Sequence, residues 1–378
     1  MQTKNSKAAE VWDCKTQTFH GGQEHRFLDN FVEDFSVTTN YLGTPKKALE
    51  AARAAISDIH HYPAANQEPA KTSLAEFLWP VDAAKHHGRL LLGNGASELI
   101  DLVVRKALVL CKERGIEAPT WKGGPWNVQY REYQRSAETN GFKILEPSSQ
   151  EAADIVCIVN PCNPTGDYFA LGEIQDWIKK NTKSGGTVLV DESMQPWHSR
   201  DFRSDSLTNA HEYIEDMWNN RQIAVHVIHS WTKIWSCTGL RVGSVICPTS
   251  SHCESLRKIQ VPWSVNGPAL KFVEAVVQDD AYMQETWENT ARLRSYLIDQ
   301  LKSLDSEWIY HGKPFLSWVW VDMRKEETAE QAVELARAAG VPVRSGTPGY
   351  GCRTFVRVAV RREPEVQRLI QAWESLRK

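Results

Sequence analysis

Lys233 is the residue of this chain whose setting most strongly indicates chemistry. It lies in the stretch SWTKIWSCTGLRVG (residues 230–243), which is otherwise poor in charge, with Ser230 three residues before it and Arg241 eight residues after it. A lysine that is poorly solvated and close to another cation has a lowered pKa, so its neutral amine can attack an aldehyde. We therefore predict that Lys233 forms a Schiff base.

Two other polar segments follow apolar runs that are typical of buried strands. Asp191 ends the run VLVD, and the turn NPCNPTG, which contains Asn163, follows the run DIVCIV. Open α/β sheets bind ligands at the carboxyl ends of their strands, so these side chains are expected near Lys233. A carboxylate at such a place needs a cationic or hydrogen-bonding partner.

The segment GNGAS predicts an anion site. It precedes the helical pattern ELIDLVVRKALVL, so the backbone of Ala96 and Ser97 would present N–H groups at a helix start, with Arg241 as a counter-charge. A lysine for an aldehyde, an acid for a pyridine nitrogen and donors for a phosphate together match pyridoxal phosphate. GNG itself does not complete the GxGxxG pattern, which disfavours a nicotinamide enzyme.

The elements that must position these residues predict an α/β fold. Short apolar runs start near Arg89, Asp154, Thr187, Ile223 and Arg241, and helix-length segments between several of them favour a mainly parallel central sheet flanked by helices. From about Ala269 onward, mixed helices and strands predict a smaller α+β domain. We expect an N-terminal segment, residues 1–50, that packs on the small domain, a large cofactor-binding domain, residues 51–268, and a small C-terminal domain, residues 269–378.

Composition narrows the class of function. The net charge is -3, with 44 Lys and Arg against 47 Asp and Glu, which argues against a nucleic-acid partner. Apolar runs are too short to cross a bilayer, and the first twenty residues lack the core of a signal peptide, so we expect a cytoplasmic protein without a membrane partner. Import of a longer precursor into an organelle stays open. The pairs His60–His61 and His86–His87 lack a third ligand at suitable spacing, so no metal site is predicted.

Across nearly its whole length the chain resembles the fold-type I pyridoxal-phosphate enzymes of the class I/II aminotransferase family. Within that family it is similar to histidinol-phosphate aminotransferase and to threonine-phosphate decarboxylase. The resemblance is carried, in the family's order, by HGG at His20, DFSVTTNYLG at Asp34, HYP at His61, GNGASELI at Gly93, YREY at Tyr130, NPCNPTG at Asn160, VDES at Val190, SWTKIWSCTGLRVG at Ser230, PWSVN at Pro262, VRSG at Val343 and VRVAVR at Val356.

The resemblance implies a role for each matching residue. Lys233 would carry the cofactor and move protons, and Asp191 would pair with the ring nitrogen. Cofactor contacts are further implied for Ala96, Ser97, Ser230 and Arg241 at the phosphate, Asn163 at the phenolic oxygen, Tyr130 (or else Tyr133) on the ring face, and Tyr62 from the other subunit of a homodimer. Arg357 would bind the α-carboxylate of the substrate, and Arg344, Asn40 and His20 would read its far end.

The chain departs from the family pattern near the expected substrate pocket. Ser193 and Met194 follow the DE pair where the family usually has a small residue and then an aromatic, often Tyr. Thr38 and Tyr41 replace an asparagine and a proline of decarboxylase-like relatives. We predict an aminotransferase that acts at Cα of a small L-amino acid, phosphorylated or not, to give a 2-oxo acid. Decarboxylation of a phospho-amino acid is the first alternative, and cofactor binding without turnover is the second.

Overall fold

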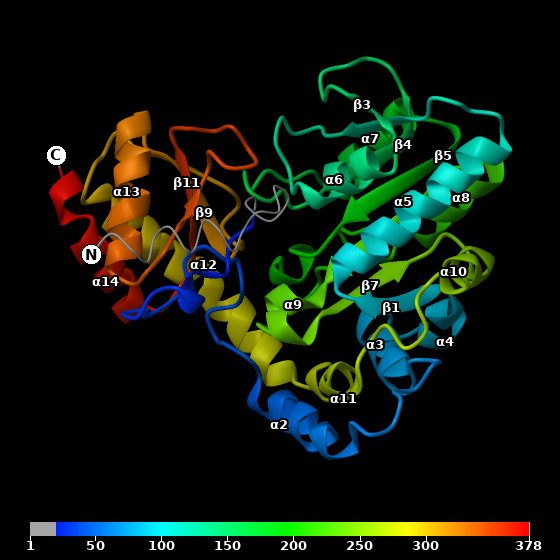
Figure 1. Cartoon of the computed structure of the whole chain (residues 1–378), viewed down its shortest axis with the longest axis horizontal. Coiled ribbons are helices and arrows are strands. Elements are labelled where there is room, and N and C mark those ends of the chain that lie inside the picture. Colours follow the sequence, from blue (N-terminus) through cyan, green and yellow to red (C-terminus); the bar gives the residue numbers. More distant parts are fainter. Residues whose placement is uncertain (1–19, 378) are drawn as a thin grey trace. The chain divides into compact units, whose positions relative to one another are not determined.

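The computed structural model describes residues 20–377, which form two compact units (Figure 1). The larger unit contains Leu42–Asn163 and Tyr168–Trp287. The smaller unit contains the described residues up to Tyr41, the short segment Pro164–Asp167 and the chain from Glu288 onward. The units therefore divide at other positions than the boundaries expected after residues 50 and 268.

The later boundary has a packing reason. Helix α11 (Gly267–Val276) packs against α2 (Lys46–Ala54) and α3 (Ala70–Leu78), so it belongs to the larger unit. Helix α12 (Asp280–Lys302) begins in the larger unit and ends in the smaller one.

A seven-stranded sheet forms the centre of the larger unit, in the order β1-β7-β6-β5-β4-β2-β3. Its strands are β1 (Leu90–Asn94), β2 (Thr120–Gly123), β3 (Lys143–Leu145), β4 (Ala153–Val159), β5 (Thr182–Asp191), β6 (Ala224–Ser230) and β7 (Val242–Ile246). Neighbouring strands are parallel from β3 to β6, whereas β7 is antiparallel to both β1 and β6. The mainly parallel sheet predicted from the sequence is confirmed.

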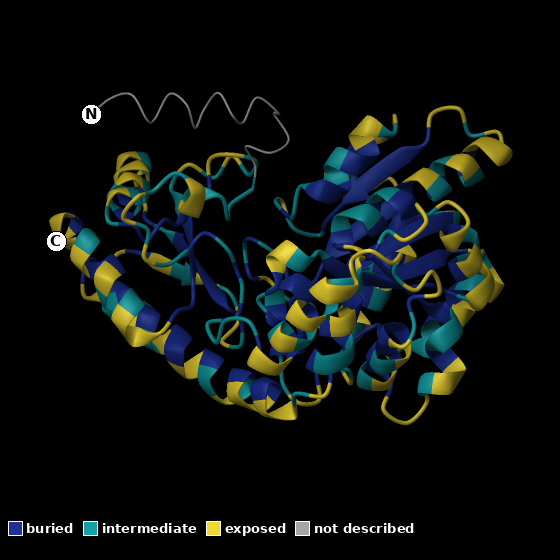
Figure 2. Ribbon diagram, turned by 60° about the horizontal axis from the view of Figure 1, so that its bottom comes forward, coloured by how far each residue is buried: buried dark blue, intermediate teal, exposed yellow. Residues whose placement is uncertain are grey.

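Helices cover this sheet because its strands are apolar on both faces. In β4, Ile155, Cys157 and Val159 belong to the core shared with α5 (Ala96–Glu113), and the alternate residues Val156 and Ile158 are also fully buried. The remaining helices of the unit are α4 (Ala83–His86), α6 (Glu132–Thr139), α7 (Leu171–Asn181), α8 (His211–Arg221), α9 (Trp231–Ile234) and α10 (Ser250–Arg257). Figure 2 shows the strands buried and the outer helix faces exposed.

The smaller unit is built on an antiparallel sheet in the order β10-β11-β9-β8. Its elements are β8 (Ile309–His311), β9 (Trp318–Asp322), α13 (Glu326–Ala338), β10 (Arg344–Ser345), β11 (Phe355–Ala359) and α14 (Glu363–Ala372). The described residues 20–41 of the N-terminal segment belong to this unit. Phe35 bridges to Val343, and the buried Arg361 donates to the carbonyl oxygens of Asp34 and Val37 at 2.6 and 2.9 Å.

Within residues 20–377, no helix is both long enough and apolar enough to cross a membrane. The same residues contain no group of three His, Cys, Asp or Glu side chains arranged to hold a metal ion.

Two buried histidines on β6 predict a loss of stability in acid. Burial lowers the pKa of His226 and of His229 to about 3, whereas an imidazole in the unfolded chain titrates near 6.5. Below pH 6.5 the unfolded state therefore binds protons that the folded state does not. The free energy of unfolding should fall by about 2 kcal/mol per histidine between pH 7 and pH 5.

Urea unfolding of the cofactor-free chain at both pH values, at one protein concentration, checks this expectation. His226→Gln should reduce the difference in the free energy of unfolding between pH 7 and pH 5 by the amount expected for one histidine, about 2 kcal/mol. His311→Gln, at an exposed position on β8, should leave it unchanged. If the free energy of unfolding depended on pH equally in all three proteins, the attribution of the acid sensitivity to His226 would be wrong.

Candidate functional site

The end of β6 places Lys233 beside two hydroxyl groups. Ser230 is the last residue of the strand, and the one-turn helix α9 follows it directly. Lys233 is half-buried, and its Nζ donates to Thr232 Oγ1 at 3.4 Å. Thr232 Oγ1 in turn lies 2.9 Å from Ser230 Oγ. The lysine amine and the strand end are thus connected by two successive hydrogen bonds.

Buried tryptophans fix this turn. Trp231 and Trp235 stack with ring centroids 4.9 Å apart, and Trp231 Nε1 donates to Ser244 Oγ on β7 at 2.9 Å. Both rings are essentially inaccessible to solvent. The apolar residues around Lys233 therefore anchor α9 in the core.

Asp191 is a buried carboxylate at the end of β5. Its Oδ2 accepts a hydrogen bond from Tyr133 OH at 2.9 Å, and its Oδ1 accepts one from the Ser193 backbone N at 2.8 Å. Burial raises the pKa of Asp191 above its usual value, and hydrogen bonds from the Ser193 side chain and backbone and from Tyr133, together with the positive charge of Lys233, limit this rise. The carboxylate is therefore held by donors that favour its ionised form.

The start of α5 lies beside the start of β7. Gly243 is the register partner of both Gly93 on β1 and Ser230 on β6, and a Cβ at Gly243 would lie 2.5 Å from Ala96 N. This close approach requires glycine. It brings the first residues of α5 next to the end of β6 at Ser230.

Arg241 lies over the start of the same helix. Gly95 has a φ of 76°, and a Cβ there would overlap Arg241 Nη2. Arg241 Nη1 donates to Thr238 O at 3.2 Å, and Arg241 itself adopts a φ of 62°, which costs an L-residue on the order of 1 kcal/mol or more. Ser97 is half-buried one residue into the helix. The helix start, the arginine and Ser230 form a cradle of donors.

The aromatic and amide residues expected at the cofactor ring also belong to the larger unit. Tyr130 is half-buried, and its ring centroid lies 6.3 Å from that of the fully buried Tyr133 in an edge-on arrangement. Asn163 is half-buried in the loop after β4. The Tyr133 hydroxyl contacts the Asp191 carboxylate, and the Tyr133 side chain is fully buried, whereas Tyr130 is only half-buried.

Arg344 and Arg357 face each other in the smaller unit. They are register partners on β10 and β11, and both are buried. Arg344 Nη2 donates to Pro348 O at 3.3 Å, and Arg357 Nη2 donates to Ser36 O at 2.5 Å. Burial lowers the pKa of Arg344 to about 10, with a smaller contribution from the charge of Arg357. A negatively charged ligand would offset this repulsion.

Residues 20–40 of the N-terminal segment include side chains that were expected at the substrate. The backbone N of Gly22, two residues after the half-buried His20, donates to Ser36 Oγ at 3.1 Å. Ser36 is also the partner of Arg357. Asn40 is buried four residues later. Within the smaller unit, the segment therefore lies against Arg357 through Ser36.

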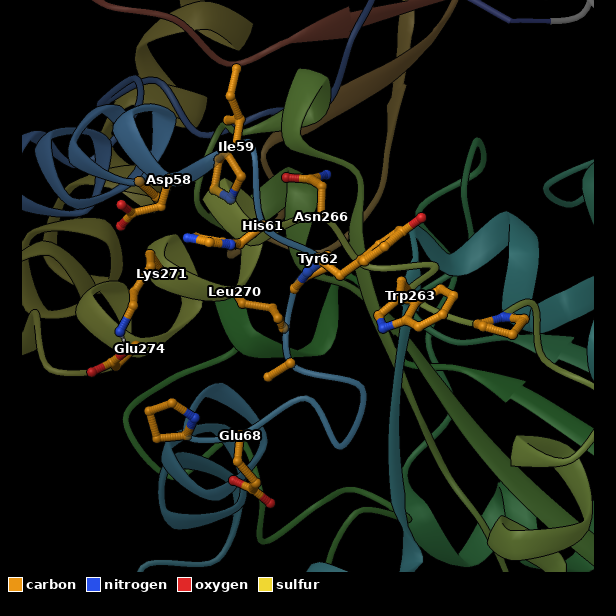
Figure 3. A pocket seen from close by; sticks show the side chains of 17 residues that line it. Asp58, Ile59, His61, Tyr62, Glu68, Trp263, Asn266, Leu270, Lys271 and Glu274 are labelled. Carbon is orange, nitrogen blue, oxygen red and sulfur yellow. Dashed lines mark hydrogen bonds and ion pairs between the residues drawn. The ribbon is translucent and has the colours of Figure 1, made fainter.

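Tyr62 lies at a pocket on the larger unit. Its side chain is 80% exposed, and its ring stacks on Trp263 with centroids 4.4 Å apart (Figure 3). The pocket has a volume of about 580 Å³ and is lined by the loop through Tyr62 and by the start of α11. Lys271 and Glu274 form an ion pair of 2.8 Å at its wall. Among the described residues that line this pocket, Lys233, Ser230, Thr232, Asp191 and Arg241 are all missing. The pocket is therefore separate from the strand ends that carry the lysine and the acid.

The residues of the larger unit fit pyridoxal phosphate. The cradle supplies N–H, hydroxyl and guanidinium donors for a phosphate, and Gly95 and Gly243 let these donors approach one another, since a Cβ at either position would clash with Arg241 or with Ala96 N. Asp191 is a buried acceptor that would suit a ring N–H, and Lys233 would supply the amine. Fold and chemistry therefore agree on one cofactor.

Sequence reasoning missed Thr232, the hydroxyl of Ser193 and the hydrogen bond made by Tyr133. The position of Thr232 could have been predicted, because its hydroxyl group directly precedes Lys233 in the sequence. Ser193 Oγ accepts from Ser230 N at 2.7 Å across 37 residues, and Tyr133 reaches Asp191 across 58 residues. No local pattern reveals contacts of that sequence separation.

Known proteins give the same picture. Histidinol-phosphate aminotransferase 2 of Pseudomonas aeruginosa is 26% identical over 338 residues, which cover 88% of this chain and 86% of the relative. The crystal structure of histidinol-phosphate aminotransferase from Sinorhizobium meliloti in complex with pyridoxal-5'-phosphate has a TM-score of 0.76 at 18% identity and 97% coverage of both chains. The structure of L-threonine-O-3-phosphate decarboxylase from Porphyromonas gingivalis has a TM-score of 0.71 at 16% identity, with 91% of this chain and 99% of that chain covered.

The family itself is identified by a match to the aminotransferase class I and II model over residues 32–372. This match and the cofactor-bound neighbour confirm the predicted fold type and pyridoxal phosphate as the cofactor. Because the matched region covers nearly the whole sequence, the chain belongs to the aminotransferase class I and II family.

Proposed function

We propose that this enzyme transfers the amino group from Cα of a small L-amino acid to an oxo-acid acceptor, and that the substrate carries a phosphate ester. The observation that carries the proposal is the connected arrangement of Lys233, Ser230 and Asp191 at neighbouring strand ends. The names of the relatives support the phosphate, since histidinol-phosphate and threonine-phosphate enzymes both act on phosphate esters.

The chain's own residues have separable tasks in this reaction. Pyridoxal phosphate, when bound, supplies an aldehyde that joins to the amine and a ring that accepts the electron pair left at Cα. Asp191 would accept a hydrogen bond from the protonated ring nitrogen, and Lys233 Nζ would take up the proton that leaves the substrate Cα. Thr232 Oγ1 accepts a hydrogen bond from that amine and so limits where it can move.

The remaining assignments concern binding. Ala96, Ser97, Ser230 and Arg241 would hold the cofactor phosphate, while Tyr130 would lie on the ring face and Asn163 at its phenolic oxygen. In the smaller unit, Arg357 would hold the substrate carboxylate, and Arg344, Asn40 and His20 would contact the phosphate end. A planar, bidentate guanidinium suits either anion.

Product analysis tests the reaction. The purified protein is incubated with amino acids, threonine phosphate and histidinol phosphate, each with and without 2-oxoglutarate, and products are identified by mass. An oxo product formed together with glutamate supports transamination. An amine and carbon dioxide, formed without an acceptor, would instead establish a decarboxylase.

Decarboxylation of a phospho-amino acid is the second candidate. The similarity in fold to the Porphyromonas gingivalis decarboxylase favours it, and the two reactions use the same cofactor residues. Met194, which is buried, supplies no hydroxyl group where the family often has a tyrosine, so this position does not decide between them. Cofactor binding without turnover is disfavoured because Lys233 and Asp191 are both present. The cytoplasmic location stays a prediction from the sequence.

We also propose a homodimer in which Tyr62 reaches the site of the partner. Tyr62 is 80% exposed, and the nearby Ile59 and Val261 are each 67% exposed, which is unusual for apolar side chains on a free surface. A two-fold interface uses the same patch on both subunits. Burial of this patch between two copies would remove these side chains from water.

Mixing two inactive variants tests the position of Tyr62. Tyr62→Ala and Lys233→Ala are combined in equal amounts, unfolded and refolded together. If Tyr62 serves the partner's site, each mixed dimer contains one intact site, and the mixture should recover about a quarter of the wild-type activity. If Tyr62 acts within its own subunit, no mixed dimer has an intact site and no activity returns, which would contradict the proposal.

A further inference from the structure

Ser193 connects two ends of the candidate cofactor site. It lies two residues beyond β5 and is buried, with 8% of its surface exposed. Its backbone N donates to Asp191 Oδ1 at 2.8 Å, and its Oγ accepts a hydrogen bond from the backbone N of Ser230 at 2.7 Å. One residue thus contacts both the acid and the strand end that borders the donor cradle.

The Ser193 hydroxyl accepts a backbone hydrogen bond from β6 beyond the point where the pairing of β5 with β6 ends. The pairing of β5 with β6 ends at Asp191 and Ile228, and Glu192 N still donates to Ile228 O at 2.9 Å. At Ser230, the next position along β6 on this side, Ser193 Oγ is the acceptor. On its other side Ser230 pairs with Gly243 of β7. The position of Ser230 is therefore fixed from both sides.

We propose that Ser193 is a positioning residue that holds Ser230 in register for the cofactor phosphate and couples this end of the site to Asp191. The proposal rests on the cofactor assignment made above. An alanine would keep the backbone N–H bond to Asp191 but would remove the acceptor of the Ser230 N–H and the side-chain hydrogen bond from Ser193 to Asp191. A partly buried N–H without its acceptor is costly, so the end of β6 would shift or loosen.

Two forms of the cofactor separate this role from a general structural one. Dissociation constants of the cofactor-free chain are measured by absorbance for pyridoxal phosphate and for pyridoxal, which lacks the phosphate. Ser193→Ala should weaken pyridoxal phosphate binding on the order of tenfold and pyridoxal binding by about threefold at most, because only the phosphate depends on the position of Ser230. Ser193→Cys keeps most of the side-chain volume but accepts hydrogen bonds weakly, and should change the ratio in the same direction.

A matched control removes a hydroxyl elsewhere in the larger unit. Ser255→Ala loses a 2.9 Å hydrogen bond to His252 O within α10 and should alter neither dissociation constant. Equal weakening of both cofactor forms in Ser193→Ala, or no weakening of either, would overturn the role of Ser193. Failure of the wild-type chain to bind pyridoxal phosphate would overturn the proposed function itself, so the two failures are distinguishable.

Discussion

Replacing Lys233 with alanine should lower kcat by at least about 10³-fold and abolish the covalent attachment of the cofactor. Lys233 lies in α9, directly after β6, and donates to Thr232, which in turn contacts Ser230. Without its amine, no group at this position takes the Cα proton. The measurement is steady-state activity together with borohydride reduction and mass analysis, which should show the added cofactor mass on wild type alone.

Two comparisons make this result specific. Lys302→Ala, at the end of α12, removes an exposed lysine and should retain full activity and labelling. Added methylamine should restore part of the activity of Lys233→Ala, because a small free amine can take the proton in place of Nζ. A borohydride-fixed cofactor in Lys233→Ala, mapped to another lysine, would show that the central assignment is wrong.

Asp191→Asn should lower kcat by about 10²- to 10³-fold, because it removes the negative charge that keeps the ring nitrogen protonated. The substitution is nearly isosteric. However, both Asp191 oxygens accept hydrogen bonds, from Tyr133 OH and from Ser193 N, so an amide NH₂ group would have to face a donor at one of the two positions. The measurement is kcat together with the absorbance of the bound cofactor across pH.

Asp154→Asn provides the matched control for Asp191→Asn. Asp154 is also a buried carboxylate of the central sheet, but it accepts from Thr120 N and Thr120 Oγ1 at 2.8 and 2.7 Å. Its replacement should lower the free energy of unfolding and leave kcat within a few-fold. Tyr133→Phe, which removes one donor to Asp191, should give a smaller loss than Asp191→Asn. A kcat for Asp191→Asn within about fivefold of wild type would contradict the role given to this carboxylate.

The sequence by itself determined the features that local patterns encode. Continuous apolar runs are typical of strands buried on both faces, and those starting near Asp154, Thr187 and Ile223 are strands of the central sheet. Lys233 and Arg241 share one short segment, so their spacing alone indicated a lysine near an anion site. Asp191 followed from the rule that ligands meet strand ends.

Only the tertiary structure decided which side chains touch across the sheet. The hydrogen bonds from Tyr133 to Asp191 and from Ser230 to Ser193 depend on strand order and register. So does the approach of Gly243 to the start of α5, which requires β7 to run antiparallel to both its neighbours. Apolar periodicity records which residues are buried, whereas contacts between distant segments are set by the packing of the whole unit.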